Sequence, residues 1–282
     1  MSGTLRIIWD YDGPIGQVNS SFPYNFDERK LLREIENVDT ILDLAKKFSI
    51  PMTFACTGFS AEPGDYPYHI GDQLKKINSQ GHEIASHSWR HEWFPFLTNE
   101  QIRLSLSRSK FALETCVGVQ GAVKGFVIPF SRPMSWYARG ALSLGDRAFG
   151  PWRKGASLGS LIKLIGEAGY KWTRVFYRPI WQELLSDRTQ NRNYSKSWEN
   201  YHVVTLIPSH YFGFDQIAKD YLLSAINHGG DLVISGHPAA LSFGREESLE
   251  NLVTFLELTA SERDQGKLLV KTVSEGLFNL NE

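Results

Sequence analysis

The sequence has few cysteines, no excess of charge of either sign and no long apolar run. Only Cys56 and Cys116 occur among 282 residues, which excludes the disulfide framework of small secreted proteins. The 30 basic and 31 acidic residues give a formal net charge of −1, so bulk charge indicates neither a nucleic-acid nor an anionic-membrane partner. No segment approaches the roughly 18 consecutive apolar residues that a membrane-spanning helix requires.

The amino terminus also lacks the features of a targeting signal. Residues 1–6 (MSGTLR) lead directly into a strand-like segment, without the charged region and long apolar stretch of a signal peptide. We therefore expect a cytoplasmic protein that acts on a neutral or weakly charged substrate.

Short apolar segments alternate with amphipathic segments along the whole chain. The apolar segments are near-continuously hydrophobic, which is typical of parallel strands buried on both faces. Eight strands are predicted, at 5–11, 51–58, 83–87, 125–130, 171–177, 202–208, 231–237 and 268–273. Helices are predicted at 28–48, 99–117, 215–227 and about 245–262. Repeated strand–helix units of this kind build a parallel sheet or barrel, here as one domain over 1–282.

Two of the helices carry start signals. Thr98 and Gln101 are spaced as a capping box in front of the second helix, and Asp215 is the expected N-cap of the third. Gly229 and Gly230 follow the third helix and are expected to end it.

The residues with catalytic chemistry fall at the carboxyl ends of predicted strands. Asp10 and Asp12 end the first strand, His87 ends the third and His237 ends the seventh. Active sites of parallel α/β proteins form at this edge. We therefore expect these four side chains to share one site.

His87 and His91 are four residues apart in the segment HSWRH. On a helical turn such a pair projects to one side, so that both imidazoles can reach one metal ion. A capping or surface role for either histidine is the alternative. The position directly after the predicted strand favours the metal site.

Asp10 and Asp12 are two residues apart and face the same side of an extended strand. Two carboxylates at the end of an apolar strand are costly unless they bind a cation, pair with an arginine or transfer protons. An ordinary Asp-Gly-Pro turn is one alternative. The Asp-x-Asp metal–nucleotide motif of glycosyltransferases is another.

The ordered set of motifs resembles the polysaccharide deacetylase superfamily (NodB-homology, carbohydrate esterase 4), in the variants found in surface-glycan gene clusters. The motifs are the aspartate-bearing strand end, GHEIASHSWRH at 81–91, IPFSRP at 128–133 and GHP at 236–238. The resemblance extends from residue 5 to about 240. It implies a distorted (β/α) barrel with seven or eight mostly parallel strands and one divalent metal ion, usually zinc. It also implies removal of an N-acetyl or related acyl group from a sugar or glycan precursor by metal-activated water.

By this resemblance, Asp12, His87 and His91 are the metal ligands and His237 is the general acid. Tyr11 occupies the family's usual base position and cannot serve, so Asp10 is the nearest replacement. Arg132 is the candidate to support the base carboxylate.

The family's fourth motif supplies an aspartate that orients the acid histidine. That motif is not recognisable around Trp172–Arg178, so no partner for His237 is predicted. Aromatic residues near the expected site could pack on a sugar; the candidates are Tyr11, Trp89, Trp93 and Trp136.

Two other functions stay open. A metal-independent cyclic-amide hydrolase of the allantoinase-like branch would not need both His87 and His91. A catalytically silent glycan-binding barrel is consistent with Tyr11 and with the altered motifs.

Overall fold

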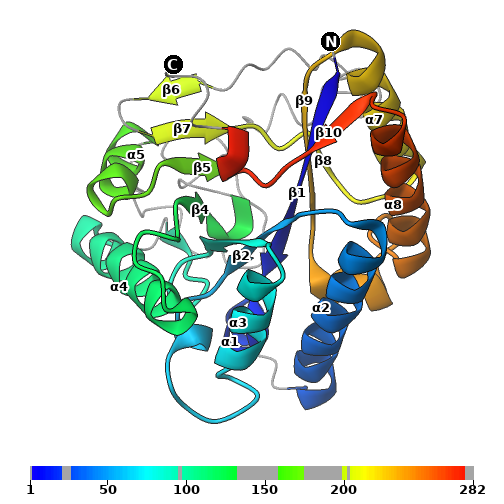
Figure 1. Ribbon diagram of the computed structural model, residues 1–282. Coiled ribbons are helices and arrows are strands. Elements are labelled where there is room, and N and C mark those ends of the chain that lie inside the picture. The colour runs from blue at the N-terminus through cyan, green and yellow to red at the C-terminus, as the bar shows by residue number, and fades with distance from the viewer. Residues whose placement is uncertain are drawn as a thin grey trace, which may run out of the picture.

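The computed structural model describes residues 2–20, 27–94, 97–131, 158–174, 199–201 and 204–276. Ten strands in these ranges form one curled sheet surrounded by helices (Figure 1). The strands are β1 (Gly3–Tyr11), β2 (Thr53–Cys56), β3 (Glu83–Ser86), β4 (Gly125–Val127), β5 (Trp172–Arg174), β6 (Glu199–Tyr201), β7 (Val204–Ile207), β8 (Tyr211–Phe212), β9 (Asp231–Gly236) and β10 (Leu268–Val270). The α-helices are α1 (Gly13–Asn19), α2 (Glu28–Phe48), α3 (Gly71–Ser79), α4 (Asn99–Val117), α5 (Leu158–Glu167), α7 (Gln216–His228) and α8 (Leu249–Asp264).

The sheet is parallel except at one edge. Its order is β6-β7-β5-β4-β3-β2-β1-β9-β8, and only the pairing of β6 with β7 is antiparallel among the described strands. β1 is central, because one side of it pairs with β9 while the other pairs first with β10 and then with β2. All eight predicted strands are present, and β6 and β8 are additional. The expected distorted (β/α) barrel is confirmed.

Side chains of the strands alternate between two separate cores. Odd-numbered residues of β1 such as Ile7 and Trp9 pack against the helices, whereas Ile8 packs inside the curled sheet. The inner core is apolar and fully buried; its members are Ile8, Ala55, Ala85, Val127, Trp172, Ile207, Val233 and Val273. The inside of the barrel is therefore filled with side chains below the site, as in other barrels of this type.

Trp172 fills much of this interior, and Gly125 makes room for it. A Cβ atom on Gly125 would lie 1.9 Å from the Trp172 ring. The indole Nε1 donates to Glu83 and to Ser274 at 3.2 and 3.1 Å. Burying so large a ring closes the barrel at the end opposite the site.

The predicted helix starts agree with the structure. Thr98 and Gln101 form the capping box of α4, and the Asp215 side chain accepts from the first turn of α7. The last helix begins at Leu249 rather than at about 245, because Ser248 caps it. Figure 1 shows α4 and α5 covering one flank of the sheet and α2, α7 and α8 the other.

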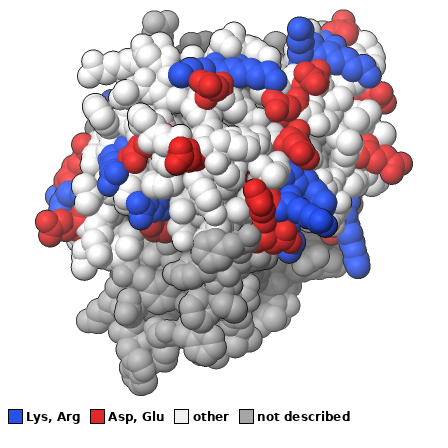
Figure 2. Space-filling model, turned by 90° about the horizontal axis from the view of Figure 1, so that it is seen from below, with Lys and Arg blue, Asp and Glu red and all other residues white. Residues whose placement is uncertain are grey.

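None of the helices in the described ranges is both long and apolar enough to cross a membrane. On the face seen in Figure 2, acidic and basic side chains are interspersed over the described part of the surface. That mixture agrees with the formal net charge of −1.

Candidate metal centre

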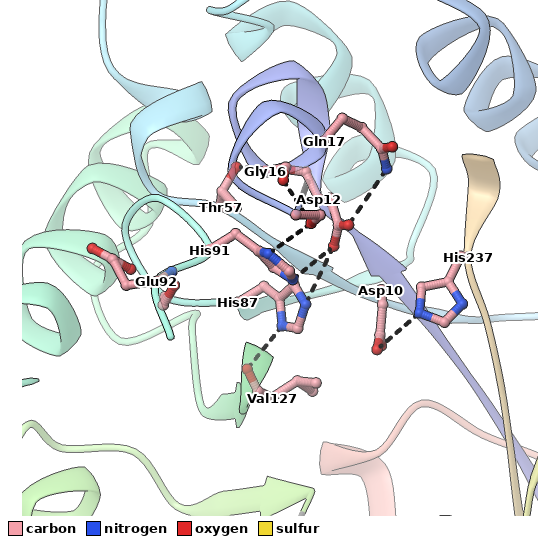
Figure 3. A network of polar contacts seen from close by, with 12 residues as sticks. Asp10, Asp12, Gly16, Gln17, Thr57, His87, His91, Glu92, Val127 and His237 are labelled. Atoms are coloured by element: carbon pink, nitrogen blue, oxygen red, sulfur yellow. Dashed lines mark hydrogen bonds and ion pairs between the residues drawn. The ribbon is translucent and has the colours of Figure 1, made fainter. Parts of the chain in front are cut away.

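Asp12, His87 and His91 converge on one point (Figure 3). The Oδ1 atom of Asp12 lies 3.4 Å from Nε2 of His87 and 3.3 Å from Nε2 of His91. One potential ligand atom from each residue lies within 4.8 Å of the others, and all three residues are buried. The structure thus brings together the three metal ligands expected from the sequence.

The segment between the two histidines is a turn rather than the expected helical turn. Ser88 and His91 have φ values of 66° and 58°, in the left-handed region that non-glycine residues rarely adopt. The Ser88 carbonyl accepts from Ser109 at 2.9 Å, and the amide of Glu92 donates to the Ser88 hydroxyl at 3.3 Å. Strained backbone held by surrounding contacts is a common property of functional sites.

Both imidazoles are held by their Nδ1 atoms. Nδ1 of His87 lies 2.8 Å from the carbonyl oxygen of Val127, which can only accept, so Nδ1 carries the proton. Nδ1 of His91 lies 3.0 Å from the Ser20 hydroxyl, which itself donates to the Gly16 carbonyl. Both Nε2 atoms are then free to act as ligands, as in metal sites whose histidines are oriented by a second hydrogen bond.

The residues fit a divalent cation. Burial lowers the pKa of His91 to about 4, so this imidazole is neutral near pH 7. Oδ1 of Asp12 is buried and has no hydrogen-bond partner among the described residues. Two nitrogen lone pairs therefore face one carboxylate oxygen with no proton between them, and a cation resolves this repulsion. Two neutral imidazoles and one carboxylate, with further coordination positions open, match a catalytic site for a divalent metal ion.

Asp10 lies beside the three residues and is paired with a buried arginine. Arg174, on β5, donates to both carboxylate oxygens of Asp10 and, at 2.9 Å, to the Ser235 hydroxyl. Burial alone would raise the pKa of Asp10, but the charges of Arg174, His87 and His237 and the hydrogen bonds from Arg174 together hold that pKa below its ordinary value. Asp10 is thus an ionised carboxylate, as a general base requires.

His237 follows β9 and is held by Glu247. Its Nδ1 lies 3.0 Å from Oε1 of Glu247, and its Nε2 lies 3.8 Å from Oδ2 of Asp10. Partial burial would lower the pKa of His237, but the hydrogen bond and charge of Glu247, together with the charges of Asp10 and Asp12, raise it to about 9. The site therefore holds an ionised carboxylate and a protonated imidazole side by side, the arrangement of an acid–base pair.

The inner face of the strands explains why these groups meet. Residues two or four apart in a strand point to the same side. Asp10 lies two residues after Ile8 and Arg174 two residues after Trp172. His237 lies four residues after Val233, so all three polar residues share the side of an inner-core residue. The apolar members fill the barrel, and the polar members lie one level above them.

The side chain of Tyr11 points out of the barrel, on the opposite side of β1 from Asp10. It is 1% exposed, packs in the outer core, and donates its hydroxyl to Gln73 on α3. Tyr11 can therefore neither act as base nor contact a sugar in the site. Trp89 is hydrogen-bonded to Glu62 at 3.0 Å and is covered by the guanidinium of Arg108.

Two site residues were missed in the sequence. Arg174 fills the role expected of Arg132, which lies outside the described residues, as does Trp136. The only available signal was the spacing of Trp172 and Arg174, two residues apart within the predicted strand 171–177, of which the structure forms Trp172–Arg174. Glu247 stands in a loop ten residues after His237, and no local pattern marks it.

Comparisons with known proteins support the family resemblance seen in the sequence. The sequence pattern of the family described as polysaccharide deacetylase matches residues 24–147. A search of curated proteins gives no significant match.

Three solved structures share the fold. A protein of Mycobacterium smegmatis assigned to the polysaccharide deacetylases has 17% identity and a TM-score of 0.67, over 99% of this chain and 90% of its own. One of Pseudomonas aeruginosa PAO1, also assigned to them, has 13% identity and a TM-score of 0.59, over 96% and 88%. Puue allantoinase has 16% identity and a TM-score of 0.60, over 96% and 88%. The family match over residues 24–147 and the shared fold confirm the resemblance of this chain to the polysaccharide deacetylase superfamily.

Proposed function

We propose that this protein is a metal-dependent hydrolase that removes an N-acetyl or related acyl group from a sugar or glycan precursor. Asp12, His87 and His91 hold one divalent cation in this proposal, with zinc favoured by two nitrogen donors and one oxygen donor. The observation that carries it is Oδ1 of Asp12, which has no hydrogen-bond donor among the described residues and faces two imidazole Nε2 atoms at 3.3 and 3.4 Å.

A cation at this position would supply Lewis-acid polarisation of the acyl carbonyl and of the attacking water. Asp10 acts as general base and takes one proton from that water as its oxygen bonds to the acyl carbon. Arg174 keeps the Asp10 carboxylate ionised and fixes its orientation through two hydrogen bonds.

His237 acts as general acid. Its Nε2 gives a proton to the departing nitrogen as the carbon–nitrogen bond breaks, which releases a carboxylic acid and an amine. After this step Asp10 carries the extra proton and His237 lacks one. The separation of 3.8 Å between Oδ2 of Asp10 and Nε2 of His237 allows the proton to return over a short path and reset the pair.

Metal analysis and acetate release test the function together. We expect about one equivalent of zinc in the purified protein and acetate release from at least one N-acetylated sugar or nucleotide-linked sugar. Metal without acetate release from any acetylated sugar would instead support a silent glycan-binding barrel. Turnover of a cyclic amide such as allantoin by metal-free protein would support the allantoinase-like alternative, which shares the fold at a TM-score of 0.60.

A further inference from the structure

Three groups surround the imidazole of His237. Glu247 contacts its Nδ1, Asp10 lies 3.8 Å from its Nε2, and the ring of Phe212 stacks on one face at a centroid distance of 5.6 Å and an angle of 19°. The side chain of His237 is nevertheless 40% exposed. One edge of the ring is thus fixed by Glu247 while the other is open to a bound substrate.

Glu247 holds His237 at two points. Its Oε1 accepts from the backbone amide of His237 at 2.8 Å and contacts the ring Nδ1 at 3.0 Å. Since a carboxylate oxygen can only accept, Nδ1 is the donor. When the imidazole is charged, its second proton therefore stands on Nε2, the atom that faces Asp10 and the open side.

The loop that carries Glu247 is anchored on both sides of this residue. The carbonyl of Glu246 accepts from the Phe214 amide at 2.8 Å, and Ser248 caps α8. Glu246 approaches closely because residue 213 is glycine, where a Cβ would lie 2.8 Å from the Cβ of Glu246. The carboxylate of Glu247 is 16% exposed and therefore held in place rather than free in solvent.

We propose that Glu247 is the positioning residue of the general acid. It fixes the His237 ring through Nδ1 so that Nε2 presents the proton which the departing nitrogen receives. A departing amine needs this proton in order to leave. This inference rests on the proposed function.

The surrounding charges support the same assignment. Asp10 and, further away, Asp12 also favour the charged imidazole, whereas the guanidinium of Arg174 offsets the charge of Asp10. Glu34 on α2 also interacts with His237, but burial raises its pKa and keeps it neutral. Among these groups only Glu247 makes a hydrogen bond to the ring.

The test compares Glu247→Gln with Glu246→Gln in the full-length, zinc-loaded chain. NMR titration of the His237 imidazole, assigned with His237→Gln, is expected to give a pKa above the ordinary histidine value in the wild type and in Glu246→Gln. In Glu247→Gln it should fall by about two pH units, towards the ordinary histidine value. In the pH profile of kcat/KM for an N-acetylated sugar, the alkaline limb should shift to lower pH by the same amount. Zinc content should stay unchanged.

The possible results separate the role of Glu247 from the proposed function. A wild-type His237 that titrates near 6.5, or the same pH profile in both variants, would overturn the role of Glu247 even if the enzyme releases acetate. A shifted titration with no acetate release from any acetylated sugar would retain the Glu247 contact and refute the proposed function. If Glu247→Gln fails to fold, Glu247→Asp and the wild-type titration decide the matter.

Discussion

Arg174 and Asp10 face each other across the inside of the barrel, from β5 and β1, and form two buried hydrogen bonds. Arg174 is 1% exposed and Asp10 3%. Since the pair is buried, neither charge has water to replace its partner, and the two residues depend on each other for stability as well as for chemistry.

Removing one partner of this pair is therefore expected to destabilise the folded protein. Asp10→Asn should abolish turnover with zinc retained, and it should lower the free energy of unfolding by about 3 kcal/mol because Arg174 loses its counter-charge. The double variant Asp10→Asn, Arg174→Met should recover part of that loss. Urea unfolding measures both effects.

An exposed ion pair provides the control for this comparison. Lys76 and Asp39 are 2.7 Å apart and about half exposed, so Asp39→Asn should change stability by less than about 1 kcal/mol. Equal losses in Asp10→Asn and Asp39→Asn would contradict the coupling of Asp10 with Arg174.

Loss of one proposed ligand should remove the metal. His87→Ala is expected to lower zinc affinity by at least about 100-fold, because a lost ligand costs more than a lost supporting hydrogen bond. Isothermal titration of the metal-free protein measures this affinity. His228→Ala, at an exposed position at the end of α7, is the matched control and should bind zinc as the wild type does. Unchanged affinity in His87→Ala would refute the three-residue site.

The parts of this site that local sequence patterns predicted are those that follow strand geometry. Asp12, His87 and His237 could be assigned because a strand end fixes both the place and the direction of its last side chains. Arg174 also ends its strand in the structure, but the predicted strand continued to residue 177, and the family resemblance placed the supporting arginine in the segment 128–133, at Arg132. Glu247 could not be predicted, because its contact with His237 is set by the path of a loop and by Gly213, not by any periodicity.

Tyr11 illustrates a second limit of sequence patterns. Its position in the strand relative to Asp12 is known from the sequence, but the outward direction of its side chain depends on which parity of β1 faces the helices. Once Ile8 and Asp10 are known to face inward, Asp10 is the only carboxylate of β1 that can reach His237 from inside the barrel.

Gly16 is expected to control metal affinity without contacting the metal. A Cβ atom there would lie 2.8 Å from the Cβ of Asp12 and 3.2 Å from the Cβ of His91, so Gly16→Ala should displace two ligands. We expect zinc affinity to fall roughly tenfold or more, as for losses of supporting contacts, although alanine favours helix α1. Gly230→Ala meets no atom within 4 Å and should leave the affinity unchanged. Zinc titration measures the affinity of both variants. Equal affinities in Gly16→Ala and Gly230→Ala would mean that Asp12 and His91 can move to accommodate the added methyl group.

Glu34 on α2 is expected to make stability depend on pH. The residue is 0% exposed, and neither carboxyl oxygen has a hydrogen-bond partner among the described residues. Burial, and then the charge of Asp12, raise the pKa of Glu34 well above its ordinary value. The folded protein therefore keeps a proton that the unfolded chain loses above about pH 4.3, so the stability cost grows as the pH rises from there towards the folded pKa.

Glu34→Gln removes this titration while keeping the shape of the side chain. Relative to the wild type, we expect little difference in Tm near pH 4 and a Tm that is higher in the variant by pH 8, because each pH unit between the two pKa values costs the wild type about 1.4 kcal/mol. Thermal unfolding is measured with a chelator present, so that metal binding at Asp12 does not contribute. Glu36→Gln, exposed on the same helix, should show no such trend. A constant offset between Glu34→Gln and the wild type at every pH would mean that Glu34 is ionised in the folded protein, and that a cation or a polar group compensates its burial.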